Sequence, residues 1–323
     1  MSATDEKIRL GVSTCLLGEP VRYNGGHKLD RWLRDVLGKY VEFVPVCPEV
    51  EVGFPTPRPP LRLVGPSDPP RLVFAQSGED VTDRMEAWAH ERCRELDEEN
   101  LCGYIFKSKS PSSGMERVKV YDRNGVPANK GVGVFARVFM EHFPLLPVED
   151  DGRLHDARLR ENFIERVFAV KRWQDLVSSG KATSTKRGDL VKFHARHKLL
   201  IMAHSPKHLT EMGRLVADAS SYRPTDLYNR YFQRFMEALK LTATVRKQCN
   251  VLQHVMGYFK KQLSPDEKQE VLEVIEQYRH GFVPLIVPIT LLNHYVRKYG
   301  PEYLAEQYYL HPHPIELSLR SHV

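Results

Sequence analysis

The chain has 323 residues, 41% of them hydrophobic and 27% charged, and a formal net charge of +6, so it is long enough for about two domains with hydrophobic cores. Five cysteines in a long chain without a secretory leader argue against a disulfide framework and indicate a reducing, cytoplasmic setting. No apolar run approaches the roughly 18 residues that a membrane-spanning helix needs, so we expect no membrane partner.

Charge is divided unevenly along the chain. Residues 1–150 contain 20 Lys and Arg against 23 Asp and Glu, a net charge of −3. Residues 151–323 contain the other 27 Lys and Arg and 18 Asp and Glu, a net charge of +9. The positive balance therefore belongs to the second half, where it favours a polyanionic partner.

Three apolar runs of strand length occur in the first half, at residues 8–12, 41–46 and 103–106. Helical patterns at residues 27–40 and 80–101 lie between them. Strands that alternate with helices predict right-handed crossovers, and therefore an α/β domain with a mostly parallel, Rossmann-like sheet.

Each of these runs is followed by a short loop, at residues 13–18, 47–49 and 110–114. Two of the loops contain a cysteine, and the third contains only serines. Ligands bind at the carboxyl ends of parallel strands, so we expect the three loops to form one site. The alternative is that loops after strands are simply rich in Gly, Pro and Ser.

The domain boundary is expected after a last strand at residues 132–139. The turn residues and acidic charges that follow are typical of a connector, and a helix is predicted at residues 156–176. We therefore predict an α/β domain, a connector with one helix and an all-α domain, over residues 1–146, 147–185 and 186–323 respectively.

The rest of the chain is helical in pattern, with helices predicted at residues 189–203 and 226–241 and a third that Ser264 and Pro265 open. His194 and His197 lie three residues apart, but without further ligands nearby we do not expect a metal site. Basic residues around the start of this part predict a phosphate-contacting, tRNA-binding stripe. It consists of Lys171, Arg172, Lys181, Lys186, Arg187, Lys192, Arg196 and Lys198.

The ordered set of motifs resembles the thiouracil desulfidase family and the helical module that is often fused to it. The whole arrangement is similar to enzymes that remove sulfur from 4-thiouridine in tRNA. The matching segments are STCLLG at 13–18, VRYNGG at 21–26, CPE at 47–49 and KSKSPSSG at 107–114, then FHARHK at 193–198 and HVMGYFK at 254–260.

This resemblance implies a 4Fe-4S cluster held by three cysteines, with the fourth iron open to the sulfur of the substrate. It gives Cys15 and Cys47 as two ligands and places Ser113 where the family has its third cysteine. A serine hydroxyl is a much poorer ligand than a thiolate because its proton is far harder to remove, so this chain can lack both cluster and activity. Ser113 is either a substitution in a working enzyme, which the nearly intact motif set favours, or a native loss.

Other residues of the three loops can contribute to the site. Glu49 could act as general acid or base, and the matching glutamate of the family lies at the substrate. We also assign Ser110 to catalysis, and we assign to substrate binding Arg22, Arg58, Lys107 and Ser112. The alternative for each is a turn residue or a solvated surface charge.

We therefore predict that the chain converts 4-thiouridine in tRNA to uridine without net electron transfer. The first domain would perform the chemistry, and the basic helices would bind the tRNA. Two alternatives are a catalytically dead tRNA-binding protein and a desulfidase of free thiouracil bases. The charge of the second half favours a nucleic acid over a free base, whereas the oligomeric state stays open.

Overall fold

The computed structural model describes residues 7–65, 69–179 and 186–322. It divides into two compact units, Met1–Asp156 and Ala157–Val323. In these described ranges, no helix combines the length and the apolar character needed to cross a membrane.

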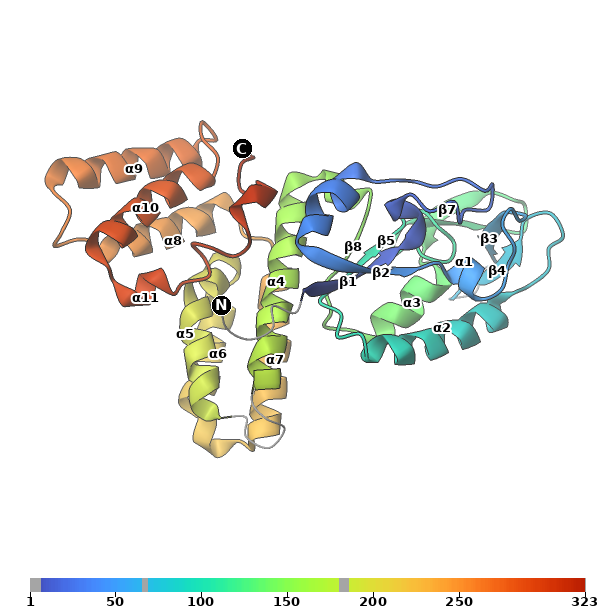
Figure 1. Ribbon diagram of the computed structural model, residues 1–323, viewed down its shortest axis with the longest axis horizontal. Coiled ribbons are helices and arrows are strands. Elements are labelled where there is room, and N and C mark those ends of the chain that lie inside the picture. The colour runs from blue at the N-terminus through green and yellow to red at the C-terminus, as the bar shows by residue number, and fades with distance from the viewer. Residues whose placement is uncertain (1–6, 66–68, 180–185, 323) are drawn as a thin grey trace. The chain divides into compact units, whose positions relative to one another are not determined.

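A four-stranded parallel sheet forms the centre of the first unit (Figure 1). The predicted α/β class is thereby confirmed, since every pairing in this sheet is parallel. The three predicted strands are β1 (Ile8–Ser13), β2 (Val41–Val46) and β5 (Tyr104–Phe106), and their carboxyl ends share one edge. In spatial order the strands are β2 (Val41–Val46), β1 (Ile8–Ser13), β5 (Tyr104–Phe106) and β8 (Val148–Asp150).

A second four-stranded sheet in this unit was not expected from the sequence. The sheet is mixed, because β3 (Leu61–Val64) pairs in parallel with β6 (Val118–Tyr121), whereas the pairings β3 with β4 (Arg71–Phe74) and β6 with β7 (Pro127–Gly131) are antiparallel. Its strands have only four or five residues, and most of β7 is exposed, so no clear apolar alternation marks them. In spatial order they are β4 (Arg71–Phe74), β3 (Leu61–Val64), β6 (Val118–Tyr121) and β7 (Pro127–Gly131).

The helices of the first unit are α1 (Pro48–Glu51), α2 (Thr82–Asp97) and α3 (Val134–His142). The predicted helix at 80–101 is confirmed as α2, but the predicted strand at 132–139 is wrong because α3 occupies most of it. Phe135 and Phe139 of α3 pack with Tyr104 and Phe106 of β5 in one aromatic core. These two phenylalanines lie one helical turn apart, and a short apolar run does not distinguish a buried helix from a strand.

The predicted helix at 27–40 is much shorter in the structure. A π-helical turn, Trp32–Val36, is followed by a 3-10 turn, Leu37–Lys39. The Asp30 carboxylate accepts hydrogen bonds from the backbone N–H groups of Trp32 and Leu33 at 2.9 and 3.1 Å, which fixes where the helix begins. The prediction followed the apolar spacing alone and therefore began the helix before this cap.

The end of the first unit also differs from the prediction. Strand β8 lies within the segment assigned to a connector, and the unit extends to Asp156 rather than ending at residue 146. A strand of three residues is too short to show a pattern in the sequence. The predicted connector helix is α4 (Ala157–Ser179) and belongs to the second unit.

The described part of the second unit is mostly helical, as predicted. The predicted helices at 156–176, 189–203 and 226–241 correspond to α4, α5 and α7. Ser264 and Glu267 form a reciprocal capping box at the start of α9. The helices are α4 (Ala157–Ser179), α5 (Arg187–His204), α6 (Pro206–Ala217), α7 (Pro224–Lys240), α8 (Val245–Gly257), α9 (Pro265–Arg279), α10 (Ile286–Tyr299) and α11 (Glu302–Ala305).

A buried ionic cluster joins α4 to the C-terminal segment of this unit. Arg320 is 3% exposed and forms ion pairs of 3.1 Å with both Glu161 and Glu165. It also donates to the carbonyl oxygen of Tyr309 at 2.6 Å, and His204 lies 3.3 Å from the other oxygen of Glu165. The guanidinium therefore compensates two carboxylates that the core would otherwise disfavour.

Candidate active site

The three predicted loops meet at one cavity of about 510 Å³ in the first unit. Nine predicted residues line this cavity, because β1, β2 and β5 end at the same edge of the sheet. They are Cys15, Arg22, Cys47, Glu49, Arg58, Lys107, Ser110, Ser112 and Ser113.

Cys15 lies in a 3-10 turn, Thr14–Leu17, directly after β1. Gly18 ends this turn with φ +101°, a conformation that favours glycine. The Cys15 carbonyl oxygen accepts the N–H of Lys28 at 2.9 Å, which fixes the turn further. Burial raises the pKa of the Cys15 thiol to about 11, although the nearby Lys107 charge opposes this shift.

Cys47 lies between β2 and α1 and lines the same cavity. Its backbone N–H donates to Glu51 Oε1 at 2.8 Å, which anchors the start of the helix. Burial also raises the pKa of the Cys47 thiol. Both thiols are therefore neutral at physiological pH until a metal ion or a strong positive charge displaces their protons.

Hydrogen bonds fix the shape of the loop at residues 110–114, which we call the serine loop. Ser110 Oγ accepts the N–H groups of Ser112 and Ser113 at 3.3 and 3.1 Å. At the start of α3, three backbone N–H groups donate to loop carbonyl oxygens at 2.8–3.2 Å, in the pairs Gly133 to Gly114, Val134 to Pro111 and Ala136 to Ser112. A Cβ atom on Gly133 would lie 2.6 Å from the Ser112 backbone, so only glycine permits this approach.

Glu49 is held at the cavity wall by two neighbours. Ser112 Oγ donates to Glu49 Oε1 at 2.8 Å, and Arg58 Nε donates to Glu49 Oε2 at 2.8 Å. The Arg58 side chain is only 2% exposed, and its other N–H groups donate to Pro55, Thr56 and Val21. Arg58 therefore orients Glu49, although the sequence assigned it to substrate binding.

Lys107 is oriented by a residue that the sequence analysis missed. Asp151, just after β8, accepts Lys107 Nζ at 2.8 Å and the N–H of Ser108 at 2.6 Å. The Lys107 backbone N–H donates to Ser13 Oγ at 2.9 Å. Asp151 follows a strand that was not predicted, so no strand-end pattern pointed to it. Arg22, by contrast, lies over the ring of Tyr23 at 5.4 Å from its centre.

The donor atoms present do not complete the cluster site that the resemblance implies. Cys15 and Cys47 provide two sulfur atoms, and Ser113 provides a hydroxyl at the third position. Within the described residues, no three His, Cys, Asp or Glu side chains gather as metal ligands. Iron–sulfur clusters are held by thiolates, so this set is one thiolate short. Cys102 cannot replace the missing ligand, because it precedes β5 at the opposite end of the strand.

The predicted tRNA-binding residues have diverse surroundings in the second unit. Arg172 is half-buried, donates to the carbonyl oxygen of Pro312 and lies over the ring of Tyr308. Three others have partners: Lys171 pairs with Asp175, Arg196 pairs with Glu306, and Arg187 donates to the carbonyl oxygens of Ala219 and Tyr222. Lys186, Lys192 and Lys198 are exposed, and Lys181 lies outside the described residues.

His194 and His197 are part of the helical core. His194 Nδ1 lies 3.1 Å from the hydroxyl of Tyr231, and His197 Nδ1 lies 2.8 Å from the carbonyl oxygen of Phe193. Burial lowers the pKa of both rings, so they are neutral at physiological pH.

Family models match both halves of the chain. The model described as 2-thiouracil desulfurase matches residues 10–151, and that described as protein of unknown function (DUF1722) matches residues 198–314. Uncharacterized protein YbgA of Escherichia coli (strain K12) is 34% identical over 164 residues, 50% of this chain and 95% of that protein. Uncharacterized protein YbbK of Bacillus subtilis (strain 168) is 35% identical over 108 residues, 32% of this chain and 71% of that protein.

One solved structure is also similar. It is described as the 4Fe-4S-dependent thiouracil desulfidase TudS, is 32% identical, and aligns with 46% of this chain and 95% of its own chain with a TM-score of 0.39. The family models and the two curated relatives confirm the family that the motifs predicted. The chain belongs to the 2-thiouracil desulfurase family through residues 10–151, followed by a helical region of the DUF1722 family.

Proposed function

We propose that the first unit is built to replace the sulfur of a thiouracil-type base by oxygen. The observation that supports this most is that Cys15, Cys47 and Glu49 line one cavity in a member of the 2-thiouracil desulfurase family. The reaction adds water to the C=S carbon and releases hydrosulfide, so it needs no net electron transfer. A cluster with an open iron would bind that sulfur, but the donor set with Ser113 does not fit such a cluster.

The residues around Glu49 position its carboxylate to act as a general base. Arg58 and Ser112 fix both carboxylate oxygens, so the group is already oriented before a substrate enters. A water molecule beside Glu49 could lose its proton to the carboxylate as its oxygen adds to the C=S carbon. Lys107, fixed by Asp151, contributes a positive charge near Cys15, where a departing sulfur would carry negative charge.

The Ser113→Cys substitution is expected to complete the site. After anaerobic treatment with iron and sulfide, this variant should bind about one cluster per chain, whereas the parent chain should bind much less. The variant should then remove the near-ultraviolet absorbance of a thiouracil base. Iron content, sulfide content and absorbance measure this prediction.

Ser108→Cys is a matched control, since it adds a thiol to the same cavity at a position outside the proposed ligand set. It should not gain iron. A parent chain that binds a full cluster would show that a serine is sufficient at position 113. If neither the parent nor Ser113→Cys desulfurises thiouracil or 4-thiouridine in tRNA, the desulfidase proposal is wrong.

We further propose that the substrate base is 4-thiouridine within tRNA rather than a free base. The net charge of +9 over residues 151–323 supports a polyanionic partner. Lys186, Lys192 and Lys198 lie exposed at or just before α5 and can contact phosphates. A base within tRNA would have to leave its stack to reach the cavity.

Salt dependence tests this binding. If the three lysines contact three phosphates, raising salt from 50 to 200 mM should weaken tRNA binding by about 40-fold through them alone. Replacing all three by glutamine should reduce the slope of log affinity against log salt by about three. A control replaces three exposed basic residues of the first unit by glutamine, namely Lys119, Arg123 and Lys130. Affinity that does not change with salt would exclude the phosphate stripe.

A further inference from the structure

The C-terminal end of α8 contributes aromatic and basic side chains that no proposed activity uses. They belong to HVMGYFK at 254–260, one of the segments that carry the family resemblance, and to the turn after it. They line a cavity of about 530 Å³ and are His254, Gly257, Tyr258, Lys260, Lys261 and Gln262. None of these described lining residues is acidic, so their positive charge favours an anionic partner.

Tyr258 provides a fixed and accessible ring in this cavity. Its ring stacks on that of Tyr303 in α11, with the ring centres 5.3 Å apart and the planes at 21°. His254, about one turn earlier on α8, contacts the ring edge-on, with 5.6 Å between the ring centres. Tyr258 nevertheless remains 42% exposed. An aromatic ring that neighbours hold in place and that solvent still reaches can stack on a further planar group.

Gly257 leaves room for such a group beside the ring. A Cβ atom added to this glycine would meet no atom within 4 Å. Its φ is not positive, so the backbone conformation does not require glycine either. Glycine lowers the stability of a helix relative to alanine, and packing does not explain its presence at the end of α8. The missing side chain therefore keeps the approach to Tyr258 open.

Lys260 and Lys261 supply the positive charge of the cavity. Both are exposed and lie between α8 and α9, two and three residues after Tyr258. Sites for single-stranded nucleic acids combine these two features, because cations contact the phosphates while aromatic rings stack on the bases. The ring and the two lysines together therefore match a nucleotide.

The aromatic pair also lies near the basic residues of α5. Arg196 on α5 pairs with Glu306, three residues after Tyr303, at 2.9 Å. The hydrogen bond from Arg196 lowers the pKa of Glu306, and the charge of Lys192 adds to this shift. Lys192, which we propose as a phosphate contact, is therefore close to the end of α11. One nucleic acid strand could reach both α5 and Tyr258.

We propose that Tyr258 stacks on an unpaired nucleotide of a bound RNA while Lys260 and Lys261 contact the neighbouring phosphates. An acidic peptide would match the lysines but would leave the ring without a stacking partner. A base-paired stem buries the faces of its bases, so the site would take a loop or an end of the RNA. This inference rests on the proposed binding of tRNA, but not on desulfuration.

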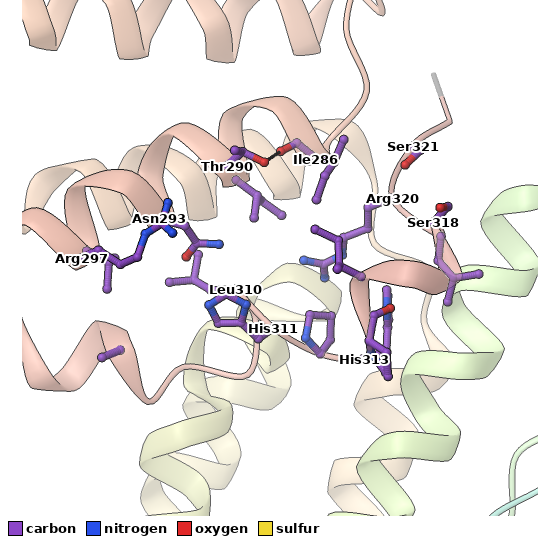
Figure 2. A pocket seen from close by; sticks show the side chains of 17 residues that line it. Ile286, Thr290, Asn293, Arg297, Leu310, His311, His313, Ser318, Arg320 and Ser321 are labelled. Atoms are coloured by element: carbon purple, nitrogen blue, oxygen red, sulfur yellow. Dashed lines mark hydrogen bonds between the residues drawn. The ribbon is translucent and has the colours of Figure 1, made fainter. Parts of the chain in front are cut away.

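A larger cavity in the same unit provides a control for this site. It measures about 660 Å³, lies between α10 and the segment from Leu310 onward, and has a mostly apolar lining (Figure 2). Thr290 on α10 lines it, and its hydroxyl donates to the carbonyl oxygen of Ile286 at 2.7 Å. The two cavities share no described lining residue. A leucine at position 290 therefore adds bulk to a cavity without affecting Tyr258.

Fluorescence anisotropy of the full chain with labelled RNA tests the stacking. The probes are a single-stranded RNA of ten uridines, the same ten-residue backbone without bases, and tRNA. Tyr258→Leu should weaken binding of the ten uridines at least fivefold and leave binding of the baseless backbone unchanged. Tyr258→Phe should retain binding of both. Phe282→Leu, which replaces a 77% exposed ring elsewhere in the unit, is the control and should bind as the parent does.

Two further variants separate the phosphate contacts from the space beside the ring. Replacing Lys260 and Lys261 together by glutamine should weaken binding of both single-stranded probes and reduce the slope of log affinity against log salt by about 1.4. Gly257→Leu should weaken binding of the ten uridines at least fivefold, because the new side chain occupies the approach to Tyr258. Thr290→Leu should bind as the parent does.

Three results would overturn the proposal. The first is that the parent chain does not bind the ten uridines at millimolar concentration. The second is that Tyr258→Leu and Gly257→Leu, both with unchanged thermal unfolding, bind every probe as the parent does. The third is that Tyr258→Leu weakens binding of the baseless backbone as much as that of the ten uridines.

These results also separate this proposal from that of the tRNA substrate. Binding of tRNA that depends on Lys186, Lys192 and Lys198 but not on Tyr258 would overturn the stacking site alone. Binding of the ten uridines that depends on Tyr258, without binding of tRNA, would support the stacking site and overturn the proposed substrate.

Discussion

Replacing Arg320 by methionine should lower the free energy of unfolding of the second unit by about 3–5 kcal/mol, because it leaves two buried carboxylates uncompensated. Glu161 and Glu165 each lose an ion pair of 3.1 Å, and the carbonyl oxygen of Tyr309 loses a donor. Burial already raises the pKa of Glu161. Hydrogen exchange measured by mass spectrometry would show faster exchange in α4 and α10 and little change in the first unit.

Arg234→Met is the matched control for this change. Arg234 is also paired with a glutamate, Glu237 at 2.9 Å, but its side chain is 52% exposed. Its loss should cost less than about 1 kcal/mol, since water replaces the partner. Adding Glu161→Gln to Arg320→Met should recover part of the lost stability. Equal effects of the two arginine substitutions would show that the cluster is not energetically significant.

Replacing Glu49 by glutamine in the Ser113→Cys chain should lower the rate of desulfuration by about 100-fold or more, the usual contribution of a general base or acid. Glutamine retains an oxygen that can accept the hydroxyl of Ser112, but it cannot take a proton from water. The measurement is kcat for loss of the thiouracil absorbance, with iron and sulfide determined on the same sample.

Iron content distinguishes a catalytic role of Glu49 from a structural one. It should equal that of Ser113→Cys alone, because Glu49 is not a proposed ligand. Glu42→Gln, an exposed carboxylate on the strand that leads to this site, is the control and should retain full activity. If Glu49→Gln keeps more than half of the rate, another group moves the proton.

The sequence predicted the helices and strands in which buried apolar residues form a continuous run or recur at a regular spacing. Strands β1, β2 and β5 were found because each is a compact apolar run, and the loops after them could be placed together because parallel strands end at one edge. The long helices of the second unit were found because their apolar stripes extend over several turns.

The predictions failed where the pattern of apolar residues was short or fitted both a helix and a strand. The run containing Phe135 and Phe139 resembles a strand as much as a helix, and packing on the sheet decided between them. The strands of the second sheet and β8 have only three to five residues, too few to show a period in the sequence. The partners of Glu49 and Lys107 could not be predicted in detail, because Arg58 and Asp151 reach them only through the tertiary fold.

The serine loop is attached to α3 through its main chain. Its folding therefore does not depend on the side chain at position 113, whereas its ability to bind a cluster does. The bonds from Gly133, Val134 and Ala136, together with those to Ser110 Oγ, involve no atom of the Ser113 side chain. Exchanging Oγ for Sγ at this position therefore changes one atom in a loop whose shape is already fixed. Selection for a stable fold alone would not distinguish the two residues, so a lineage could lose or regain the third thiolate in a single step.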